Sequence, residues 1–286
     1  MPYTASSALL QPAKKILLVC LLIAGIAGCS PNNVSVDDSL GKYFEQRHVR
    51  GTFALFDNGQ GHFTVYNLLR YRDSAYLPAS TFKIVNSLIG LQTGRVSNEK
   101  MVIPWDGVVR IFPNGDTAKA WNQDLTMEKA FEVSAVPYYQ EVARRIGKDT
   151  MQFWLDSLHY GNHTIGGRVD SFWLDNSLTI TPDEQLGLVK RLYFGQLPFQ
   201  KRVQDIVKKM MVRENTSKYI LAYKGGLGTS GNGNEIGLMV GWVEENRHPY
   251  FFVLNTEGGR DLPMANMRLD LLKDILKQLG FLEGKR

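Results

Sequence analysis

Ser80 and Lys83 place a hydroxyl group close along the chain to an amine that could accept its proton. Residues three apart in a helix share one face, so the two side chains could meet. The first N–H groups of a helix lack intrahelical partners and can stabilise a developing oxyanion. Together these groups suit nucleophilic acyl transfer. The S-x-x-K pattern is short, however, and by itself it more often marks a capping serine beside a solvent-reaching lysine.

A buried helix is predicted to carry this pair. Pro78 and Ser80 are typical of a helix start, and Gly94 is typical of a helix end. The large apolar side chains between them point in nearly every direction, which indicates a helix buried on all sides. They are Phe82, Ile84, Val85, Leu88, Ile89 and Leu91.

Three further polar clusters interrupt otherwise ordinary stretches. Ser134 falls between two predicted helices, Tyr160 and Asn162 follow a predicted helix end, and Lys224 is expected to end a strand. Turn and junction chemistry explains each cluster taken alone. Their order along the chain after Ser80 makes the combination much more specific to one kind of site.

The order of predicted elements indicates an α+β fold. Strands are predicted at residues 52–56, 62–66, 219–223, 237–243 and 250–254, so they come from both ends of the chain. Residues 94–215 are mostly helical in pattern, and a last helix is expected over 264–279. We expect an α/β sandwich: an antiparallel sheet built from both chain ends, packed by N- and C-terminal helices, with a helical insert. A site would form in the cleft between sheet and insert.

Capping signals divide the helical insert. Thr126 can cap a short helix, and Thr181 begins another with proline at its first position and Glu184 completing a capping box. Helices are also predicted over 137–147 and from a cap at Asp149 to residue 158.

The N-terminus has the pattern of a bacterial export signal. Lys14 and Lys15 precede an uncharged stretch, residues 16–28, which is too short for a comfortable membrane span. Small residues then precede Cys29 as in a lipoprotein signal, although an ordinary secretory signal with an accidental cysteine is the alternative. The predicted divisions are a signal peptide over 1–28, a tether over 29–40 and a catalytic domain over 41–286.

Composition excludes several classes of protein. Of the two cysteines, Cys20 lies inside the signal and only Cys29 would remain, so neither a disulfide nor a cysteine metal site is expected. The formal net charge of +5 is not gathered into basic runs, and nucleic-acid binding is not implied.

At this point the chain resembles the class D serine β-lactamases, the oxacillinases, from about residue 51 to 280. The resemblance rests on motifs that begin at Pro78, Ser134, Tyr160, Phe172 and Gly241, and on Arg268 in the last helix. The S-x-x-K set is shared with penicillin-binding proteins and class A β-lactamases. The serine β-lactamase and transpeptidase fold is therefore implied for the catalytic domain.

The resemblance implies that Ser80 is the acylating nucleophile and that Lys83 is the general base, carrying a carbamate formed with CO₂ or bicarbonate. No other cofactor and no metal is expected. Phe82 and Val136 would desolvate Lys83, which lowers a lysine pKa and leaves the amine free to add CO₂. Trp173, followed by Leu174, would donate its indole N–H to the carbamate, although a plain core role fits both residues.

Further roles are implied on the substrate side. Ser134 would pass a proton to the leaving nitrogen, and Lys224 would supply a positive field. The N–H groups of Ser80 and Leu227 would form the oxyanion hole. Arg268, with the strand at Gly225 and Gly226, would bind the substrate carboxylate.

Gly225 departs from the family pattern, which has threonine or serine there. A hydroxyl that would bind the substrate carboxylate is missing, and Ser134 with Arg268, or else Thr229 or Ser230, would have to replace it.

The leading hypothesis is a periplasmic β-lactamase that hydrolyses β-lactam antibiotics, is anchored to the outer membrane by lipid on Cys29, and is a monomer or homodimer. One alternative is a penicillin-binding sensor or peptidase domain that is acylated without turnover. The other is a non-catalytic lipoprotein that binds peptidoglycan.

Overall fold

The computed structural model describes residue 1, residues 33–112 and residues 115–286 of the chain. Residues 34–286 form one compact unit. Cys29 and the predicted signal peptide lie outside the described residues. Residues 34–40, expected in the tether, belong to the compact unit: they form strand β1 (Val34–Val36) and a 3-10 helix η1 (Asp38–Leu40).

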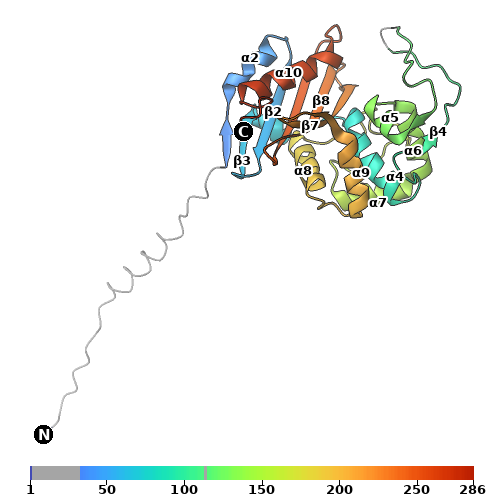
Figure 1. Ribbon diagram of the computed structural model, residues 1–286, viewed down its shortest axis with the longest axis horizontal. Helices are drawn as coiled ribbons and strands as arrows, with labels where there is room; N and C mark the ends of the chain where they lie inside the picture. The colour runs from blue at the N-terminus through green and yellow to red at the C-terminus, as the bar shows by residue number, and fades with distance from the viewer. Residues whose placement is uncertain (2–32, 113–114) are drawn as a thin grey trace. The chain divides into compact units, whose positions relative to one another are not determined.

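A mixed sheet runs through the unit (Figure 1). Within the described residues it has seven strands, in the spatial order β1, β3 (His62–Tyr66), β2 (Arg50–Asp57), β9 (His248–Gly258), β8 (Glu235–Glu245), β7 (Ile220–Thr229) and β6 (Val212–Asn215). All neighbours pair antiparallel except β1, which runs parallel to β3. The predicted antiparallel sheet from both chain ends is confirmed, with β1 as its parallel exception.

Apolar side chains point alternately to the two sides of the strands, so both faces of the sheet are buried. Phe53 and Leu55 of β2 face one hydrophobic cluster, while Ala54 and Phe56 face another. Successive side chains of a strand point to opposite faces, so an apolar strand of this kind requires cover on both.

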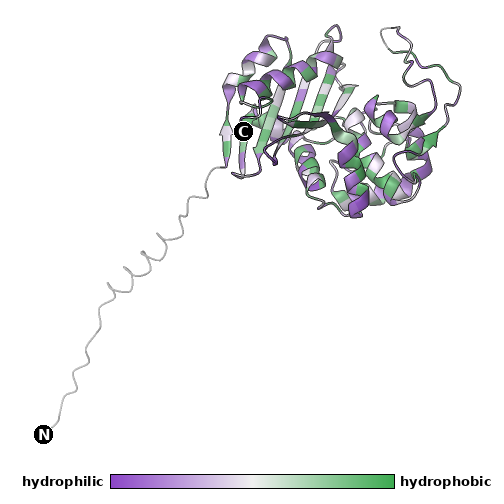
Figure 2. Ribbon diagram, in the orientation of Figure 1, coloured by the Kyte–Doolittle hydropathy of each residue, from purple (hydrophilic) through white to green (hydrophobic). Residues whose placement is uncertain are grey.

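Helices supply that cover. On one face lie α10 (Met264–Gln278) and α2 (Gly41–Glu45), and the buried apolar residues of α10 belong to the same hydrophobic cluster as that face of the sheet. Hydrophobic and hydrophilic residues alternate along the ribbon of α10 (Figure 2). No sequence pattern predicted α2. On the other face α8 (Pro182–Tyr193) packs against β8 and β9 and joins the sheet to the insert.

The insert is helical, as expected. Its elements are α4 (Lys83–Gln92), α5 (Met127–Glu132), α6 (Val136–Ile146), α7 (Lys148–Leu158) and α9 (Lys201–Met211), with a small sheet of β4 (Val102–Ile103) and β5 (Leu125–Thr126). A further short helix, α3 (Leu68–Asp73), precedes it. The caps predicted at Thr126 and Thr181 are present, but Gly147 rather than Asp149 precedes α7. No helix in the described residues is long and apolar enough to cross a membrane.

The helix that follows Ser80 is buried as predicted. All residues of α4 from Lys83 to Leu91 are buried, and the helix packs against α6 and α9. Gly94 adopts a left-handed conformation just beyond its end, which only glycine adopts at little cost. The start differs from the prediction: Ser80 is in a separate 3-10 turn, η2 (Ala79–Phe82), and caps nothing.

Candidate active site

Ser80 and Lys83 are in direct contact. The Lys83 Nζ atom lies 2.7 Å from the Ser80 Oγ atom, across the junction of η2 and α4. Lys83 is 1% exposed, and burial lowers the pKa of its ammonium to about 7. At neutral pH much of the amine is therefore uncharged and can accept a proton. The predicted juxtaposition is confirmed.

Local backbone constraints hold the serine in place. The Ala79 N–H donates to the Trp173 carbonyl at 3.0 Å, and Thr81 donates both its hydroxyl and its N–H to the Pro78 carbonyl. Ala79 has φ of +47°, a left-handed conformation that costs a non-glycine residue free energy. Surrounding hydrogen bonds offset this cost and fix Ser80 at the mouth of the buried helix.

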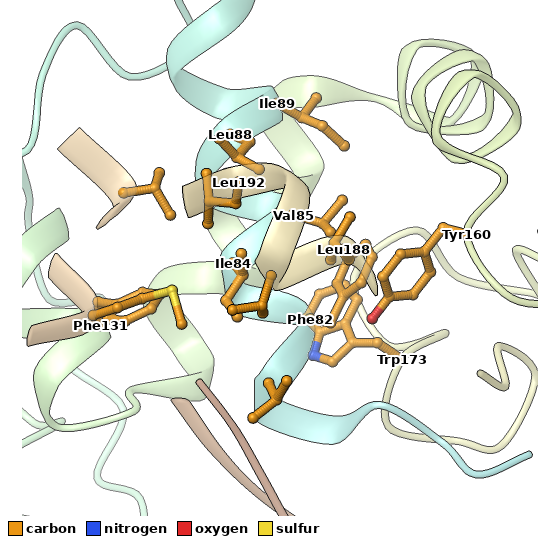
Figure 3. Close-up of a cluster of buried hydrophobic side chains, with 14 of the residues drawn as sticks. Phe82, Ile84, Val85, Leu88, Ile89, Phe131, Tyr160, Trp173, Leu188 and Leu192 are labelled. Carbon is orange, nitrogen blue, oxygen red and sulfur yellow. The ribbon is translucent and has the colours of Figure 1, made fainter. Parts of the chain in front are cut away.

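An aromatic cluster adjoins the pair through Phe82, whose side chain lies with those of Tyr160 and Trp173 (Figure 3). The Phe82 ring stacks on the Trp173 indole with centroids 5.4 Å apart, and it meets Phe172 and Tyr160 edge-on. The Trp173 Nε1 atom is buried and has no hydrogen-bond partner in the described part of the chain. A buried N–H without an acceptor is costly, so this donor suits a group that the protein chain alone does not supply.

A second serine–lysine contact faces the first. The Lys224 Nζ atom lies 2.9 Å from the Ser134 Oγ atom and donates to the Gly225 carbonyl at 2.9 Å. Ser134 is in the turn between α5 and α6, in a left-handed conformation with φ of +58°. The backbone strain at Ser134 aims its hydroxyl at the lysine rather than along a helix.

Positive charge accumulates around Lys224. Burial lowers the pKa of its ammonium well below the usual value, and the charges of Lys83, Arg213 and Arg268 lower it further. A site of this kind attracts anions, because an anion bound among like-charged cations relieves their repulsion.

Lys224 does not end a strand, contrary to the prediction. It lies in the middle of β7, which pairs with β8 from Ile220 to Thr229. Pairing with β6 extends only to Ala222, so beyond that residue the other edge of β7 faces η2.

Two glycines allow the close approach of β7 to its neighbours. A Cβ atom at Gly226 would lie 3.1 Å from the Pro78 carbonyl oxygen of η2's cap. A Cβ atom at Gly225 would lie 3.1 Å from both Arg268 Nε and Met239 Sδ. The missing hydroxyl at Gly225 is thus accompanied by an arginine that packs into the space beside the strand.

Arg268 reaches this edge from α10. Burial lowers the pKa of its guanidinium to about 10, and its Nη1 atom is buried with no hydrogen-bond partner among the described residues. A cavity of about 600 Å³ opens in front of it, also lined by Ser134, Lys224, Gly225 and Arg213. Three basic side chains and the Ser134 hydroxyl therefore line one hollow, which suits the binding of a carboxylate.

Sequence reasoning missed Arg213, since nothing in its short polar stretch distinguishes it from a solvent-exposed charge. The signal that could have found it is spatial, because β6 must lie beside β7 for its side chain to enter the cavity.

The other residues predicted for the site do not take part in the two serine–lysine contacts. Leu227 is on the η2-facing stretch of β7 and is 36% exposed, Val136 begins α6, and Leu174 packs against the main hydrophobic cluster. Thr229 and Ser230 are hydrogen-bonded within the turn between β7 and β8.

Tyr160 and Asn162 make structural contacts with the surrounding chain. The Asn162 side chain donates to the Ser177 carbonyl at 2.8 Å and accepts from the Thr179 N–H at 3.1 Å. Tyr160 is buried in the aromatic cluster.

A serine and a buried lysine at a helix start, faced by a serine from a helix–helix turn and a lysine from a sheet strand, are typical of the penicillin-interacting serine enzymes. In agreement, residues 50–279 match the family described as the penicillin binding protein transpeptidase domain. Within this group, the chain belongs to the class D β-lactamases.

Two relatives show how closely the chain follows that class. It is 37% identical to β-lactamase OXA-5 of Pseudomonas aeruginosa, in an alignment covering 95% of this chain and 99% of the relative. It is 39% identical to the probable β-lactamase YbxI of Bacillus subtilis (strain 168), covering 93% and 97%.

Solved structures agree with the sequence comparison. The crystal structure of a class D β-lactamase, YbXI from Nostoc, superposes with a TM-score of 0.79 at 38% identity, covering 86% of this chain and all of that one.

Proposed function

We propose that this chain hydrolyses β-lactam antibiotics through an acyl-enzyme on Ser80, with carboxylated Lys83 as the general base. The observation that carries the proposal is the 2.7 Å contact between Lys83 Nζ and Ser80 Oγ, made by a lysine whose burial lowers its pKa to about 7. The membership of the class D β-lactamases supports the choice of substrate.

The carboxylation of Lys83 is supported by its surroundings. A neutral amine adds CO₂ to form a carbamate and releases one proton, and the carbamate supplies an anionic base. The buried Trp173 N–H, which lacks a partner in the described chain, suits that anion as a donor. Phe82 stacks on the indole and Leu174 packs nearby, so water is kept from the group.

Acylation then follows from the positions of the side chains. The Lys83 group takes the Ser80 proton as the Oγ atom attacks the lactam carbonyl, and the C–N bond of the ring breaks. Donors at the Ser80 and Leu227 N–H groups stabilise the oxyanion. Ser134, hydrogen-bonded to Lys224, passes a proton to the departing nitrogen. In deacylation, Lys83 takes a proton from a water that attacks the ester.

The substrate's ring carboxylate is assigned to the cavity beside β7. Arg268 offers a guanidinium nitrogen without a partner among the described groups, and Lys224 adds its charge. The lack of a side chain at Gly225 leaves Arg268 its place beside the strand, where a Cβ atom would lie 3.1 Å from Arg268 Nε.

Turnover of a chromogenic β-lactam tests the proposal. We expect a burst followed by steady-state hydrolysis, and Ser80→Ala should lose covalent labelling by penicillin while keeping its melting temperature. A burst without turnover would instead indicate a penicillin-binding sensor or peptidase. No reaction would indicate a non-catalytic lipoprotein. Labelling of the alanine variant at full stoichiometry would contradict the role of Ser80.

We also propose that Cys29 carries lipid and that this lipid anchors the enzyme to the outer membrane, on its periplasmic side. Small residues before Cys29 and the uncharged stretch over 16–28 support this. Mass spectrometry of the membrane fraction should find acylated Cys29 as the first residue, and an unmodified cysteine would contradict the anchor. Sedimentation of the purified catalytic domain would decide between monomer and homodimer.

A further inference from the structure

Arg213 lies at an irregularity in the pairing of β6, next to the first residue of that strand. Val212 pairs with Ala222 of β7, whereas Glu214 pairs with Leu221, so β6 has one more residue than its partner over this step. Arg213 is that additional residue. A β-bulge bends its strand and re-aims a side chain, and such bulges are frequent beside active sites.

The guanidinium of Arg213 lies against Phe131 of α5. Its Cζ atom is 5.6 Å from the ring centroid, and its Nη2 atom donates to the Phe131 carbonyl at 3.4 Å. The same ring lies 5.6 Å from the Lys224 Nζ atom. Phe131 therefore places two cations around one aromatic ring, and one of them belongs to the catalytic site.

The carboxylates closest to these cations have lysine partners of their own, although the charge of Glu132 also acts on Arg213. Glu132 and Glu214 also line the cavity, but Glu132 pairs with Lys129 at 2.9 Å. Glu214 pairs with Lys273 at 2.6 Å and accepts a hydrogen bond from Tyr219. No carboxylate in the described part of the chain forms an ion pair with Arg213 or Arg268.

The cavity is larger than one carboxylate needs. Its volume of about 600 Å³ is in the range of pockets that hold whole small molecules. Arg268 is assigned to the ring carboxylate of the substrate, and Arg213 lines the same cavity from β6. A group attached to the ring near its carboxylate would project into this space.

We propose that Arg213 is a specificity-determining residue, and that the cavity favours β-lactams bearing a second carboxylate near the ring carboxylate. The proposal rests on the proposed function, because it assigns the ring carboxylate to Arg268. A planar, permanently charged guanidinium is well suited to a carboxylate, and the excess of cations makes binding of a second anion favourable.

The test compares two β-lactams that share a ring system and differ by one carboxylate on the substituent next to the ring carboxylate. Binding is measured by calorimetry in the Ser80→Ala background, so the result does not depend on turnover. Arg213→Met removes the charge, and Arg213→Lys retains it. Lys209→Met is the matched control, since it removes one exposed positive charge from α9 outside the cavity. Melting temperatures establish that each variant is folded.

Arg213→Met should weaken binding of the dianionic compound about tenfold and of the monoanionic compound less than twofold. Arg213→Lys should keep most of the parent protein's preference for the dianionic compound. Lys209→Met should change the affinity for neither compound. Salt at high concentration should reduce the preference. Equal weakening of both compounds would show a purely structural Arg213 and overturn the inference, as would an equal effect of Lys209→Met. Should Arg213→Met not fold, an unchanged preference at high salt in the parent protein would overturn it. Failure of the parent enzyme to hydrolyse either compound would overturn the proposed function instead.

Discussion

Replacing Trp173 by phenylalanine tests the carboxylation of Lys83 most directly. The variant keeps a ring to stack on Phe82, 5.4 Å away in the parent, but lacks the buried indole N–H. A hydrogen bond to a charged group contributes about 1.5–3 kcal/mol. Its loss should weaken the carbamate about 10- to 150-fold, since about 1.4 kcal/mol corresponds to a factor of ten.

The assay is steady-state hydrolysis of a chromogenic β-lactam in degassed buffer, titrated with bicarbonate. Trp173→Phe should need at least about tenfold more bicarbonate for half-maximal turnover and should accumulate acyl-enzyme at low bicarbonate. With ¹³C-labelled bicarbonate, its carbamate NMR signal should fall in parallel. Trp154→Phe is the control. Trp154 is a half-buried tryptophan of α7 that stacks on Phe199, away from the site. An identical bicarbonate requirement in all three proteins would refute the reasoning.

Three other predictions concern single groups. Without added bicarbonate, turnover should fall about tenfold per pH unit below about 7, because the buried Lys83 amine becomes protonated there and cannot add CO₂; a flat profile down to pH 5 would contradict this. Gly225→Ala should raise KM for penicillins about three- to tenfold with little change in kcat, because its Cβ displaces Arg268; steady-state kinetics would show an unchanged KM if the guanidinium does not bind substrate. Glu245→Ala removes a buried carboxylate that accepts two backbone N–H groups near the C-terminus, at 2.7 and 3.0 Å, and should lower the free energy of unfolding by about 2–4 kcal/mol. Calorimetric melting checks this, and specific activity should be unchanged.

Sequence patterns predicted those parts of the site that depend on residues close to one another along the chain. The contact of Ser80 and Lys83 follows from a three-residue spacing within one turn, which any helical geometry preserves. The burial of α4 likewise follows from its apolar composition. The capping box of Thr181 and Glu184 is specified within four consecutive residues and was found where expected.

Long-range geometry was harder to predict. The glycines after Lys224 suggested a strand end, but Gly226 lies where β7 runs close past η2 and Gly225 lies where Arg268 packs beside the strand. No local signal distinguishes a strand end from such close packing. The left-handed backbone at Ser134 is imposed by packing around the turn, since serine has no intrinsic preference for it. Arg213 enters the site only because a bulge aims it across to another strand.

The pairing of β2 with β9 has a consequence for how the chain matures. Residues 50–57 lie at one end of the chain and pair with residues 250–257 at the other, with the whole helical insert between them. During synthesis, β2 has an unpaired edge until nearly the last residues have emerged from the ribosome. The central pair of the sheet is therefore among the last structures that can form, and it closes a very large loop. The complete sheet can therefore form only after β9, the last strand in the sequence, has been synthesised.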